Sequence, residues 1–269
     1  MRIYLAGTYS RPWVFYGGEN MKIYLAGVAP WKETGLYDDA IIKNKPYILE
    51  SFYYINNETK RLLPYFGDFF LDSGAFTFMQ NNHKGEVNWN EYLERYADFI
   101  NKNNIKNFFE LDIDTIVGYD EVIKLRKKLE KITNKQCIPV WHKSRGKENF
   151  LSMCDEYGYV AVGGIVSGEI KSTEYKYFPY FINEAHKRKA KIHGLGFTNL
   201  SGLKKYHFDS VDSTAWVSGN RFGNIYKFNG KTMVKVNKKP GQKLSNSRLT
   251  ALNNFMEWVK FQKYAEVHL

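Results

Sequence analysis

The chain has 269 residues, of which 43% are hydrophobic and 17% aromatic, so it can bury a large core and is not a disordered chain. A formal net charge of +11 favours a partner that carries phosphates, although a composition rich in lysine would produce the same charge without one. Two cysteines are too few for a disulfide framework or a cysteine zinc site, and no apolar run approaches the roughly 18 residues of a membrane span, so we expect a cytoplasmic protein.

The first segment of the chain nearly repeats itself. Residues 1–7 read MRIYLAG and residues 21–27 read MKIYLAG, so the two copies differ only in Arg2 and Lys22. Two similar strands would explain the repeat, and an N-terminal extension over residues 1–20 would explain it as well. The sequence leaves open which copy forms the first strand.

Short β-branched or aromatic runs then alternate with segments of helical periodicity, which is the pattern of successive βα units. The seven expected strands are Lys22–Val28, Phe69–Phe76, Asn107–Ile113, Cys137–His142, Tyr159–Val166, Lys191–Phe197 and Ser210–Trp216. The helices expected between them are Val87–Asn101, Asp120–Lys131, Lys147–Tyr157, Tyr175–Lys189 and Leu200–Tyr206. Because seven strands approach the eight of a closed barrel, the sequence predicts an α/β fold of the (β/α)8 TIM-barrel type.

The pattern changes towards the C-terminus, over residues 223–269. Asn224–Phe228 and Lys231–Val236 flank Asn229-Gly230, which predicts a β-hairpin with a type I′ turn. A basic stretch, Asn237–Lys243, follows. A last helix, from about Ser245 to Tyr264, would bury Leu249, Leu252, Phe255, Met256 and Val259. We expect residues 1–269 to form a single barrel domain that this helix closes.

Acidic residues stand at the ends of two expected strands that lie far apart in the sequence. Asp72 is followed by Ser73 and Gly74, and Asp212 lies in the last expected strand. In a parallel barrel the carboxyl ends of all strands meet at one face, where active sites form. Two carboxylates on that face suit displacement at an anomeric carbon, since one can attack carbon while the other moves protons. The alternative for Asp72 is a turn of Asp, Ser and Gly without a chemical role.

A third acidic group lies in Asn107–Ile113 and just beyond it. Glu110, Asp112 and Asp114 alternate with Phe109, Leu111 and Ile113, so a strand's period of two predicts that the acids share one face and point into the barrel. Buried carboxylates need partners, which favours a functional cluster over a solvated edge strand. Metal binding by Asp and His is a competing use, but no recognised ligand spacing is present, so we expect no metal.

Other strand ends bring histidines and glycines to the same face. His142 ends one expected strand, and His193 precedes Gly194 and Gly196 in another. Glycines at Gly163 and Gly164 would let the backbone approach a planar ligand closely. Neither glycine pair has the full dinucleotide fingerprint or the lysine of a phosphate loop, so no nucleotide cofactor is expected.

Taken in order, four motifs resemble the tRNA-guanine transglycosylases, and most closely their DNA-modifying relatives, which insert 7-deazaguanines. LDSGAF at residues 71–76 is similar to the family's Asp-Ser-Gly-Gly-Phe, and GGIVSGE at residues 163–169 to its Gly-Gly-Leu-x-Val-Gly-Glu. HGLG at residues 193–196 is similar to Met-Gly-Val-Gly, and VDS at residues 211–213 to Phe-Asp-Cys. The zinc site of the tRNA enzymes and the Pro-Thr-Arg after their nucleophile are missing. Both departures favour the DNA-acting branch.

The resemblance implies a role for each matching residue. Asp72 would be the acid/base and Asp212 the nucleophile, with Asp209 as the neighbouring alternative. His142 replaces a glutamine of the family, which leaves the identity of the base open. The residues that would bind the base are Ser73, Asp112, Asp114, His142, Gly163, Gly164, Ile165, Glu169, His193, Gly194 and Gly196.

The function implied by the resemblance is exchange of guanine in a nucleic acid, DNA rather than tRNA, for a 7-deazaguanine base through a covalent aspartyl-sugar intermediate. No cofactor is implied, the sequence leaves open whether a helper protein takes part, and the setting would be the cytoplasm of a bacterium or phage-infected host. The target guanine must leave the base stack, and Lys143, Arg145 and Arg221 are candidates for phosphate contacts. Two alternatives stay open: a nucleoside or nucleic-acid glycosidase, and a non-catalytic nucleic-acid-binding subunit.

Overall fold

Eight parallel strands form one curled sheet in the computed structural model, which describes residues 20–27, 35–74, 77, 87–197, 199–217, 223–236 and 246–269. The strands are β1 (Lys22–Ala26), β2 (Tyr47–Ser51), β3 (Asp68–Asp72), β4 (Asn107–Phe108), β5 (Val140–Trp141), β6 (Tyr159–Val162), β7 (Lys191–Gly194) and β8 (Ser210–Ser213). They pair in the order β4-β3-β2-β1-β8-β7-β6-β5. A parallel bridge between Phe109 and Ile138 connects the two ends of that order. The predicted (β/α)8 TIM-type fold is therefore confirmed.

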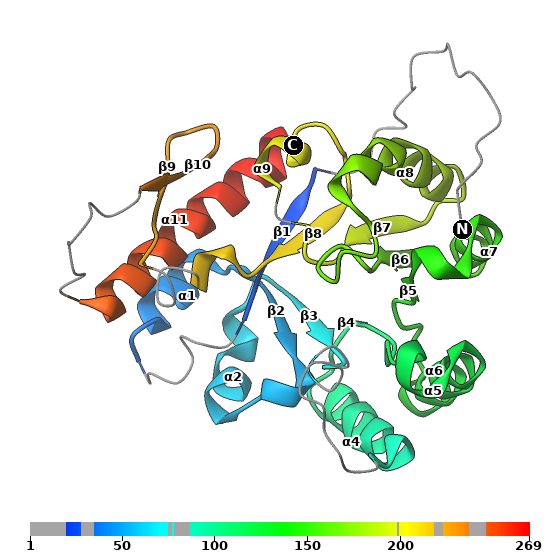
Figure 1. The fold of residues 1–269 in the computed structure, drawn as a ribbon. Helices are drawn as coiled ribbons and strands as arrows, with labels where there is room; N and C mark the ends of the chain where they lie inside the picture. The colour runs from blue at the N-terminus through cyan, green and yellow to red at the C-terminus, as the bar shows by residue number, and fades with distance from the viewer. Residues whose placement is uncertain are drawn as a thin grey trace.

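Helices surround the curled sheet (Figure 1). They are α1 (Asp38–Asn44), α2 (Asn57–Leu62), α4 (Trp89–Lys102), α5 (Asp114–Val117), α6 (Tyr119–Thr133), α7 (Lys147–Glu156), α8 (Phe178–Lys187), α9 (Leu200–Leu203) and α11 (Ser247–His268). Helix α4 shows why they pack there. Its Leu93, Tyr96 and Ile100, spaced by three and four residues, are buried against Leu71 of β3 and Phe108 of β4.

Strand β2 is absent from the seven strands predicted above. Its sequence, YILES, has an apolar run of only three residues between Pro46 and a 3-10 turn, η2 (Phe52–Tyr54), and it contains Glu50, which is 1% exposed. Parallel pairing with β1 and β3 determines the conformation of β2. In this pairing Ile48 lies between Leu25 of β1 and Phe69 of β3. Tertiary pairing outweighs a weak local pattern here.

The predicted hairpin is present, with its turn one residue later than expected. Strands β9 (Ile225–Phe228) and β10 (Met233–Val236) pair antiparallel, and the Asn229 N–H donates to the Thr232 carbonyl at 3.1 Å. The two central residues are therefore Gly230 and Lys231 rather than Asn229 and Gly230. Gly230 has a φ of 89°, and the Asn229 side chain accepts hydrogen bonds from the N–H groups of Lys231 and Thr232.

Helix α11 closes the barrel beside β1, as Figure 1 shows. Asn246 caps it by accepting from the Leu249 N–H at 3.0 Å. Phe255 and Val259 are buried as predicted, but Leu249 is 60% exposed because the helix turns Trp258 and Phe261 inwards instead. No helix in the described ranges is long and apolar enough to cross a membrane.

A glutamine on α11 hydrogen-bonds backbone groups of β1 and β2 at the point where the two strands do not pair with each other. Gln262 is 2% exposed, and its amide donates to the Tyr47 carbonyl at 2.9 Å and to the Ile23 carbonyl, while its oxygen accepts from the Tyr47 N–H at 3.0 Å. A buried backbone group that loses its partner costs about 1–3 kcal/mol.

We therefore expect Gln262→Ala to lower the free energy of unfolding by about 2–4 kcal/mol, since it leaves three backbone groups unpaired. Urea unfolding followed by circular dichroism measures the change. Lys263→Ala, at the next and exposed position, is the matched control and should change stability by less than about 0.5 kcal/mol. Equal losses in the two variants would contradict this account of how α11 is attached.

Candidate active site

Asp72 and Asp212 lie at the carboxyl ends of β3 and β8. Asp72 is the last residue of β3, and Asp212 is the third of the four residues of β8. Burial, together with repulsion from the carboxylates of Asp112 and Asp212, raises the pKa of Asp72 to about 6, against an opposing hydrogen bond from Gly74. Because the carboxyl ends of the parallel strands meet at one end of the barrel, Asp72 and Asp212 belong to the same end.

The turn after Asp72 holds its carboxylate in place. The Gly74 N–H donates to Asp72 Oδ2 at 3.0 Å, and Gly74 has a φ of 83°. A side chain at Gly74 would have its Cβ only 2.8 Å from Tyr53 Cβ and 2.9 Å from Ser51 Oγ, so this position requires glycine. Ser73 is fully buried, with no hydrogen-bond partner for its hydroxyl among the described residues. Its predicted contact with substrate is therefore not supported.

Asp212 is 6% exposed and is held through one of its two oxygens. Its Oδ1 accepts from the Gly196 N–H at 2.6 Å and lies 3.3 Å from Nε2 of His193. Both of these contacts are made by Oδ1, and neither involves Oδ2. Gly196 thus contacts the carboxylate rather than a base.

Asp209, the neighbouring alternative nucleophile, lies at the other end of the strand. Its carboxylate accepts from the Ile192 N–H at 2.7 Å and contacts His186 Nε2 of α8 at 2.9 Å. It precedes the first residue of β8, so it belongs to the amino-terminal end of the barrel. This position gives Asp209 a structural role and leaves Asp212 as the carboxylate of the site.

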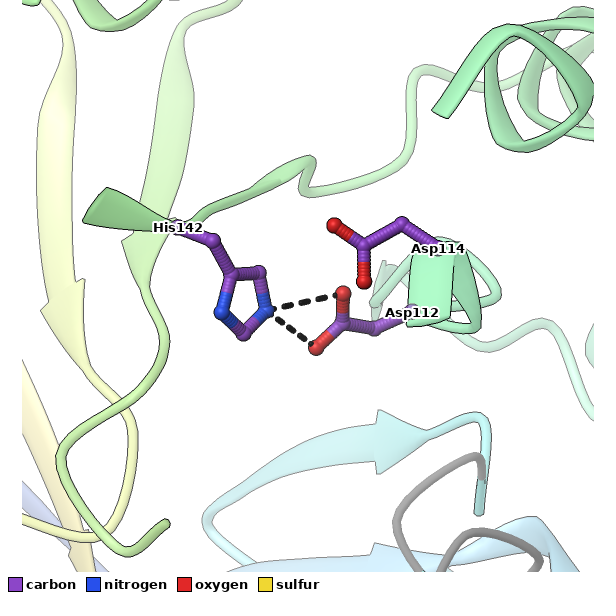
Figure 2. A group of neighbouring side chains, drawn as sticks. All are labelled: Asp112, Asp114 and His142. Carbon is purple, nitrogen blue, oxygen red and sulfur yellow. Dashed lines mark hydrogen bonds and ion pairs between the residues drawn. The ribbon is translucent and has the colours of Figure 1, made fainter. Parts of the chain in front are cut away.

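His142 is held between two carboxylates at the end of β5. Its Nε2 lies 2.8 Å from Asp112 Oδ2 (Figure 2), and its Nδ1 lies 2.9 Å from Glu169 Oε2. Burial alone would lower the pKa of His142, but the hydrogen bonds to Asp112 and Glu169 and the charge of Asp112 outweigh it and raise that pKa to about 10. The hydrogen bond from His142 holds the pKa of Glu169 below its usual value. A pKa above neutral favours the protonated ring, which then donates one hydrogen bond to each of the two acids.

The two adjacent glycines make room for this pair of side chains. A Cβ at Gly163 would lie 2.8 Å from the His142 ring, and one at Gly164 would lie 2.6 Å from Glu169 Oε2. The sequence suggested that these glycines admit a planar ligand, whereas in the structure they admit the protein's own imidazole and carboxylate. Gly194 faces Phe197 and Phe208, with a Cβ at 3.2 and 3.4 Å from them. It packs in the core rather than against a ligand.

Arg145 joins Asp112 to Asp114. Its side chain is 3% exposed, with Nη2 at 2.9 Å from Asp114 Oδ2 and 3.4 Å from Asp112 Oδ1. The guanidinium also lies over the Tyr119 ring at 4.3 Å and donates to the Val140 carbonyl. The carboxylate and imidazole atoms of Asp112, Asp114 and His142 lie within 4.8 Å of one another, as a metal site requires. Arg145 and His142 already supply positive charge there, so a cation would have to displace them.

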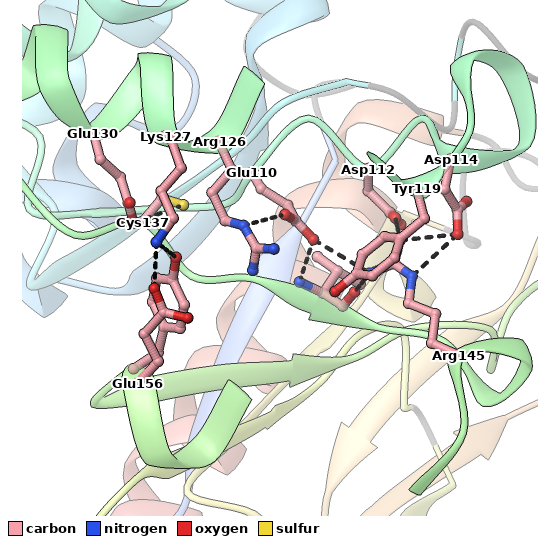
Figure 3. A network of polar contacts seen from close by, with 12 residues as sticks. Glu110, Asp112, Asp114, Tyr119, Arg126, Lys127, Glu130, Cys137, Arg145 and Glu156 are labelled. Carbon is pink, nitrogen blue, oxygen red and sulfur yellow. Dashed lines mark hydrogen bonds and ion pairs between the residues drawn. The ribbon is translucent and has the colours of Figure 1, made fainter. Parts of the chain in front are cut away.

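Glu110 does not share a face with Asp112, contrary to the predicted alternation. Phe109 is the residue that packs inside the barrel, with Phe70 and Val140, because regular strand geometry ends at the Phe109 bridge. Glu110 is fully buried outside the lumen, near Arg126 of α6 and Arg145 (Figure 3). Burial raises the pKa of Glu110 to about 7, although both arginines oppose it.

The three residues predicted to contact phosphates differ in what the structure shows of them. Arg145 is buried in ion pairs and is not placed to contact a polymer. Lys143, at the start of a 3-10 turn, is about a quarter exposed and pairs with Glu174 at 2.6 Å. Arg221 lies outside the described residues, as do residues 1–19, Ala75 and Phe76, and the basic stretch from Asn237 onwards.

We expect Arg145→Met to lower the free energy of unfolding at pH 7 by about 3–5 kcal/mol, because it leaves the acids around it without their cation. Arg145 holds down the pKa of Glu110, which is about 7 in the wild type and should be higher in the variant, so the loss should shrink as the pH falls from about 9 to about 6. Urea unfolding at pH 7 measures the size of the loss, and unfolding at about pH 9 and about pH 6 measures its trend. Arg61→Met removes an arginine with two acidic partners, Asp38 and Glu58, from an exposed site and should change little. A loss at Arg145 that is small, or the same at both pH values, would contradict this role.

Two exposed tyrosines on the rim were not predicted as functional, because they follow the strand that the sequence pattern did not reveal. Tyr53 and Tyr54 lie in η2, the 3-10 turn that follows β2, are 38% and 44% exposed, and have ring centroids 4.9 Å apart. Tyr53 backs onto Gly74, the residue that holds the Asp72 carboxylate. Aromatic side chains beside the site are thus open to solvent.

Comparisons with known proteins identify the fold of this chain but no family to which it belongs. No protein-family model and no curated protein matches the chain. Among solved structures, a protein of Aquifex aeolicus VF5 is similar over 92% of this chain and 93% of its own, with 12% identity and a TM-score of 0.56. A GH113 β-1,4-mannanase also matches, with 12% identity over 66% of this chain and 72% of its own and a TM-score of 0.40. The carboxyl transferase domain of Rhizobium etli pyruvate carboxylase matches with 12% identity over 93% of this chain and 49% of its own and a TM-score of 0.47. The Aquifex likeness supports the barrel fold alone.

Proposed function

We propose that the protein is a nucleic-acid transglycosylase that exchanges guanine for a 7-deazaguanine, with Asp212 as nucleophile and Asp72 as acid/base. The observation that carries the proposal is the contrast between these two carboxylates at one barrel end. Asp72 has a pKa raised to about 6, so it can hold and release a proton near neutral pH. Asp212 is oriented through Oδ1, with Oδ2 left to attack. One acid suited to proton transfer and one fixed carboxylate are what displacement at a sugar carbon needs.

The proposed reaction has two displacements that balance. Asp212 Oδ2 attacks C1′ of the target nucleotide, the C1′–N9 bond breaks, and guanine leaves with the proton of Asp72. The incoming 7-deazaguanine then gives its N9 proton to Asp72 while N9 attacks C1′, and the bonding electrons of the sugar ester return to Asp212. Asp72 is protonated again at the end, so no water and no redox partner enters the cycle.

The His142 cation fills the region where the base would bind, together with Asp112 and Glu169. A purine that donates hydrogen bonds can take the place of the His142 ring on Asp112, because both present N–H groups to that carboxylate. In this proposal the ring moves aside when a base enters. The exchange of one N–H partner for another keeps the half-buried Asp112 carboxylate hydrogen-bonded throughout.

A single-stranded or flipped nucleotide would reach the site past Tyr53 and Tyr54, whose rings can stack on the neighbouring bases. We expect Tyr53→Ala and Tyr54→Ala each to weaken binding of a single-stranded oligonucleotide on the order of tenfold, while the phenylalanine variants keep it. Fluorescence anisotropy measures this. Tyr65→Ala is the control: Tyr65 is 42% exposed but precedes β3, at the amino-terminal end of the barrel. Equal weakening by all three alanine variants would contradict the placement of the polymer.

The test of the proposed function supplies labelled 7-deazaguanine with single-stranded DNA, duplex DNA or tRNA. Incorporation of label without abasic sites is the expected result, and the best polymer identifies the substrate. Abasic sites without incorporation would identify a glycosidase instead. Absence of incorporation from every polymer, with Asp212→Ala indistinguishable from the wild type, would defeat the proposal.

A further inference from the structure

A chain of hydrogen bonds runs inside the barrel and ends on Asp212. The Tyr159 hydroxyl lies 2.6 Å from Ser210 Oγ, which lies 2.5 Å from His193 Nδ1. The other ring nitrogen, Nε2, lies 3.3 Å from Asp212 Oδ1. The four residues come from β6, β7 and β8, which are neighbours in the sheet, so the strand pairing itself sets their spacing.

His193 sits in the packed interior of the barrel, below the open end. Its side chain is fully buried, with ring centroids at 6.2 Å from Tyr24, 5.3 Å from Phe70 and 5.4 Å from Phe109. It therefore does not contact a substrate, which corrects the role that the sequence suggested. His193 can influence a reaction only through the carboxylate that it touches.

The partners of His193 determine where its proton lies. Asp212 offers only acceptor oxygens, so Nε2 carries the hydrogen. Nδ1 faces a hydroxyl, whereas each nitrogen of the cationic His142 faces a carboxylate, and three aromatic rings enclose His193. Full burial among these rings disfavours a charged imidazole, and the Ser210 hydroxyl can donate to Nδ1 as a carboxylate cannot, so a neutral ring fits this site.

With a neutral ring, every donor in the chain points towards Asp212. Nδ1 must accept, so Ser210 donates its only hydrogen to it, and Ser210 Oγ in turn accepts from the Tyr159 hydroxyl. Hydrogen bonds aligned in one direction polarise one another, which strengthens the last one. The hydroxyls of Ser210 and Tyr159 thus strengthen the hydrogen bond from His193 to Asp212 without contacting Asp212 themselves.

We infer that His193 is a positioning residue for Asp212, and that Ser210 and Tyr159 fix its Nε2-protonated form. The expected effect on kinetics rests on the proposed function, whereas the protonation state of His193 does not. In the reaction, Asp212 loses its negative charge when the sugar ester forms and regains it when the incoming base displaces it. A donor on Oδ1 stabilises the returning charge, so the chain assists the second displacement more than the first.

The protonation state can be tested without any substrate. Nitrogen-15 NMR of histidine-labelled protein at pH 7 should show one neutral ring protonated at Nε2, whose signals are absent in His193→Gln. Ser210→Ala should shift both ring nitrogens of that signal, because Nδ1 loses its donor. A His193 ring that is cationic or protonated at Nδ1, or that does not respond to Ser210→Ala, would overturn the inference even if the enzyme exchanges guanine.

The kinetic consequence is tested by three variants and a control. Ser210→Ala and His193→Leu should lower kcat about tenfold or more, leave KM for the incoming base nearly unchanged, and cause the covalent intermediate to accumulate. His193→Gln, whose amide N–H replaces the Nε2 donor, should recover part of the rate. Thr133→Val removes an equally buried hydroxyl, bonded to the Leu129 carbonyl of α6, and should leave kcat unchanged.

The outcomes separate this inference from the proposed function. If Asp212→Ala is inactive while Ser210→Ala and His193→Leu keep the wild-type kcat, the positioning role fails and the function stands. If Asp212→Ala is as active as the wild type, the proposed function fails, and the NMR result alone decides the protonation state. Loss of rate that Thr133→Val reproduces would show an effect of stability rather than of positioning.

Discussion

Asp212→Asn should abolish base exchange, with a loss in kcat of about 10⁴-fold or more, because an amide cannot form the sugar ester. The fold should survive the change, since the Asn side chain can still accept from the Gly196 N–H that now bonds Oδ1. Single-turnover kinetics with a labelled oligonucleotide measures the rate, and thermal unfolding checks the fold.

Asp209→Asn is the matched control for that experiment. Asp209 is 8% exposed and, like Asp212, accepts from a backbone N–H, but it contacts His186 and Ile192 at the amino-terminal end of the barrel. We expect it to lower stability and to leave kcat within about twofold of the wild type, because its partners, Ile192 and His186, are not those of Asp212, which are Gly196 and His193. Residual exchange by Asp212→Asn, or a kcat lost equally in Asp209→Asn, would remove Asp212 from the role of nucleophile.

Asp72→Asn should lower kcat by about 10²- to 10⁴-fold, which is the usual contribution of a general acid or base. The rate of ester formation in the wild type should fall as the pH rises through about 6, because Asp72 loses the proton that guanine needs. Asp72→Asn should lack this inflection. A wild-type profile that is flat between pH 5 and 8 would contradict the assignment.

The same substitution should make the protein more stable at neutral pH. The pKa of Asp72 is raised from 3.8 to about 6 on folding, so wild-type stability falls as the pH rises from about 4 through 6. Asn cannot ionise, so Asp72→Asn should gain on the order of 1 to 2 kcal/mol at pH 7 and nothing at pH 4.

Urea unfolding at the two pH values tests the sign of this effect. The pKa of Asp38 is lowered by its hydrogen bond with Arg61, so Asp38→Asn should not gain stability at pH 7, and its loss should be small because the pair with Arg61 is exposed. If Asp72→Asn loses stability relative to the wild type at pH 7 but not at pH 4, then burial does not oppose the charge of Asp72.

Local pattern was sufficient where one face of an element is apolar and its ends are marked. The strands that carry Asp72 and Asp212 were predicted because aromatic and β-branched residues lead directly into the acids. Strand β2 was missed because its apolar run is short and includes Glu50, and its pairing with β1 and β3 cannot be read from the segment alone. Missing it also concealed Tyr53 and Tyr54.

Side-chain partners were harder to predict than positions. The alternation of Glu110, Asp112 and Asp114 assumed a strand longer than the one that forms, since β4 ends at Phe108 and the bridge at Phe109. The glycines at Gly163 and Gly164 are needed for His142 and Glu169, which contact each other across 27 residues of sequence. Only the folded chain brings such partners together.

The central claim is that a sugar becomes bonded to Asp212, and intact mass measurement under denaturing conditions tests it most directly. Protein mixed with a guanine-containing single-stranded oligonucleotide should gain the mass of that oligonucleotide minus guanine, with the adduct mapped to Asp212 by proteolysis and released by added 7-deazaguanine. An adduct that persists in Asp212→Asn, or no adduct with any polymer that the protein exchanges or cleaves, would contradict the account.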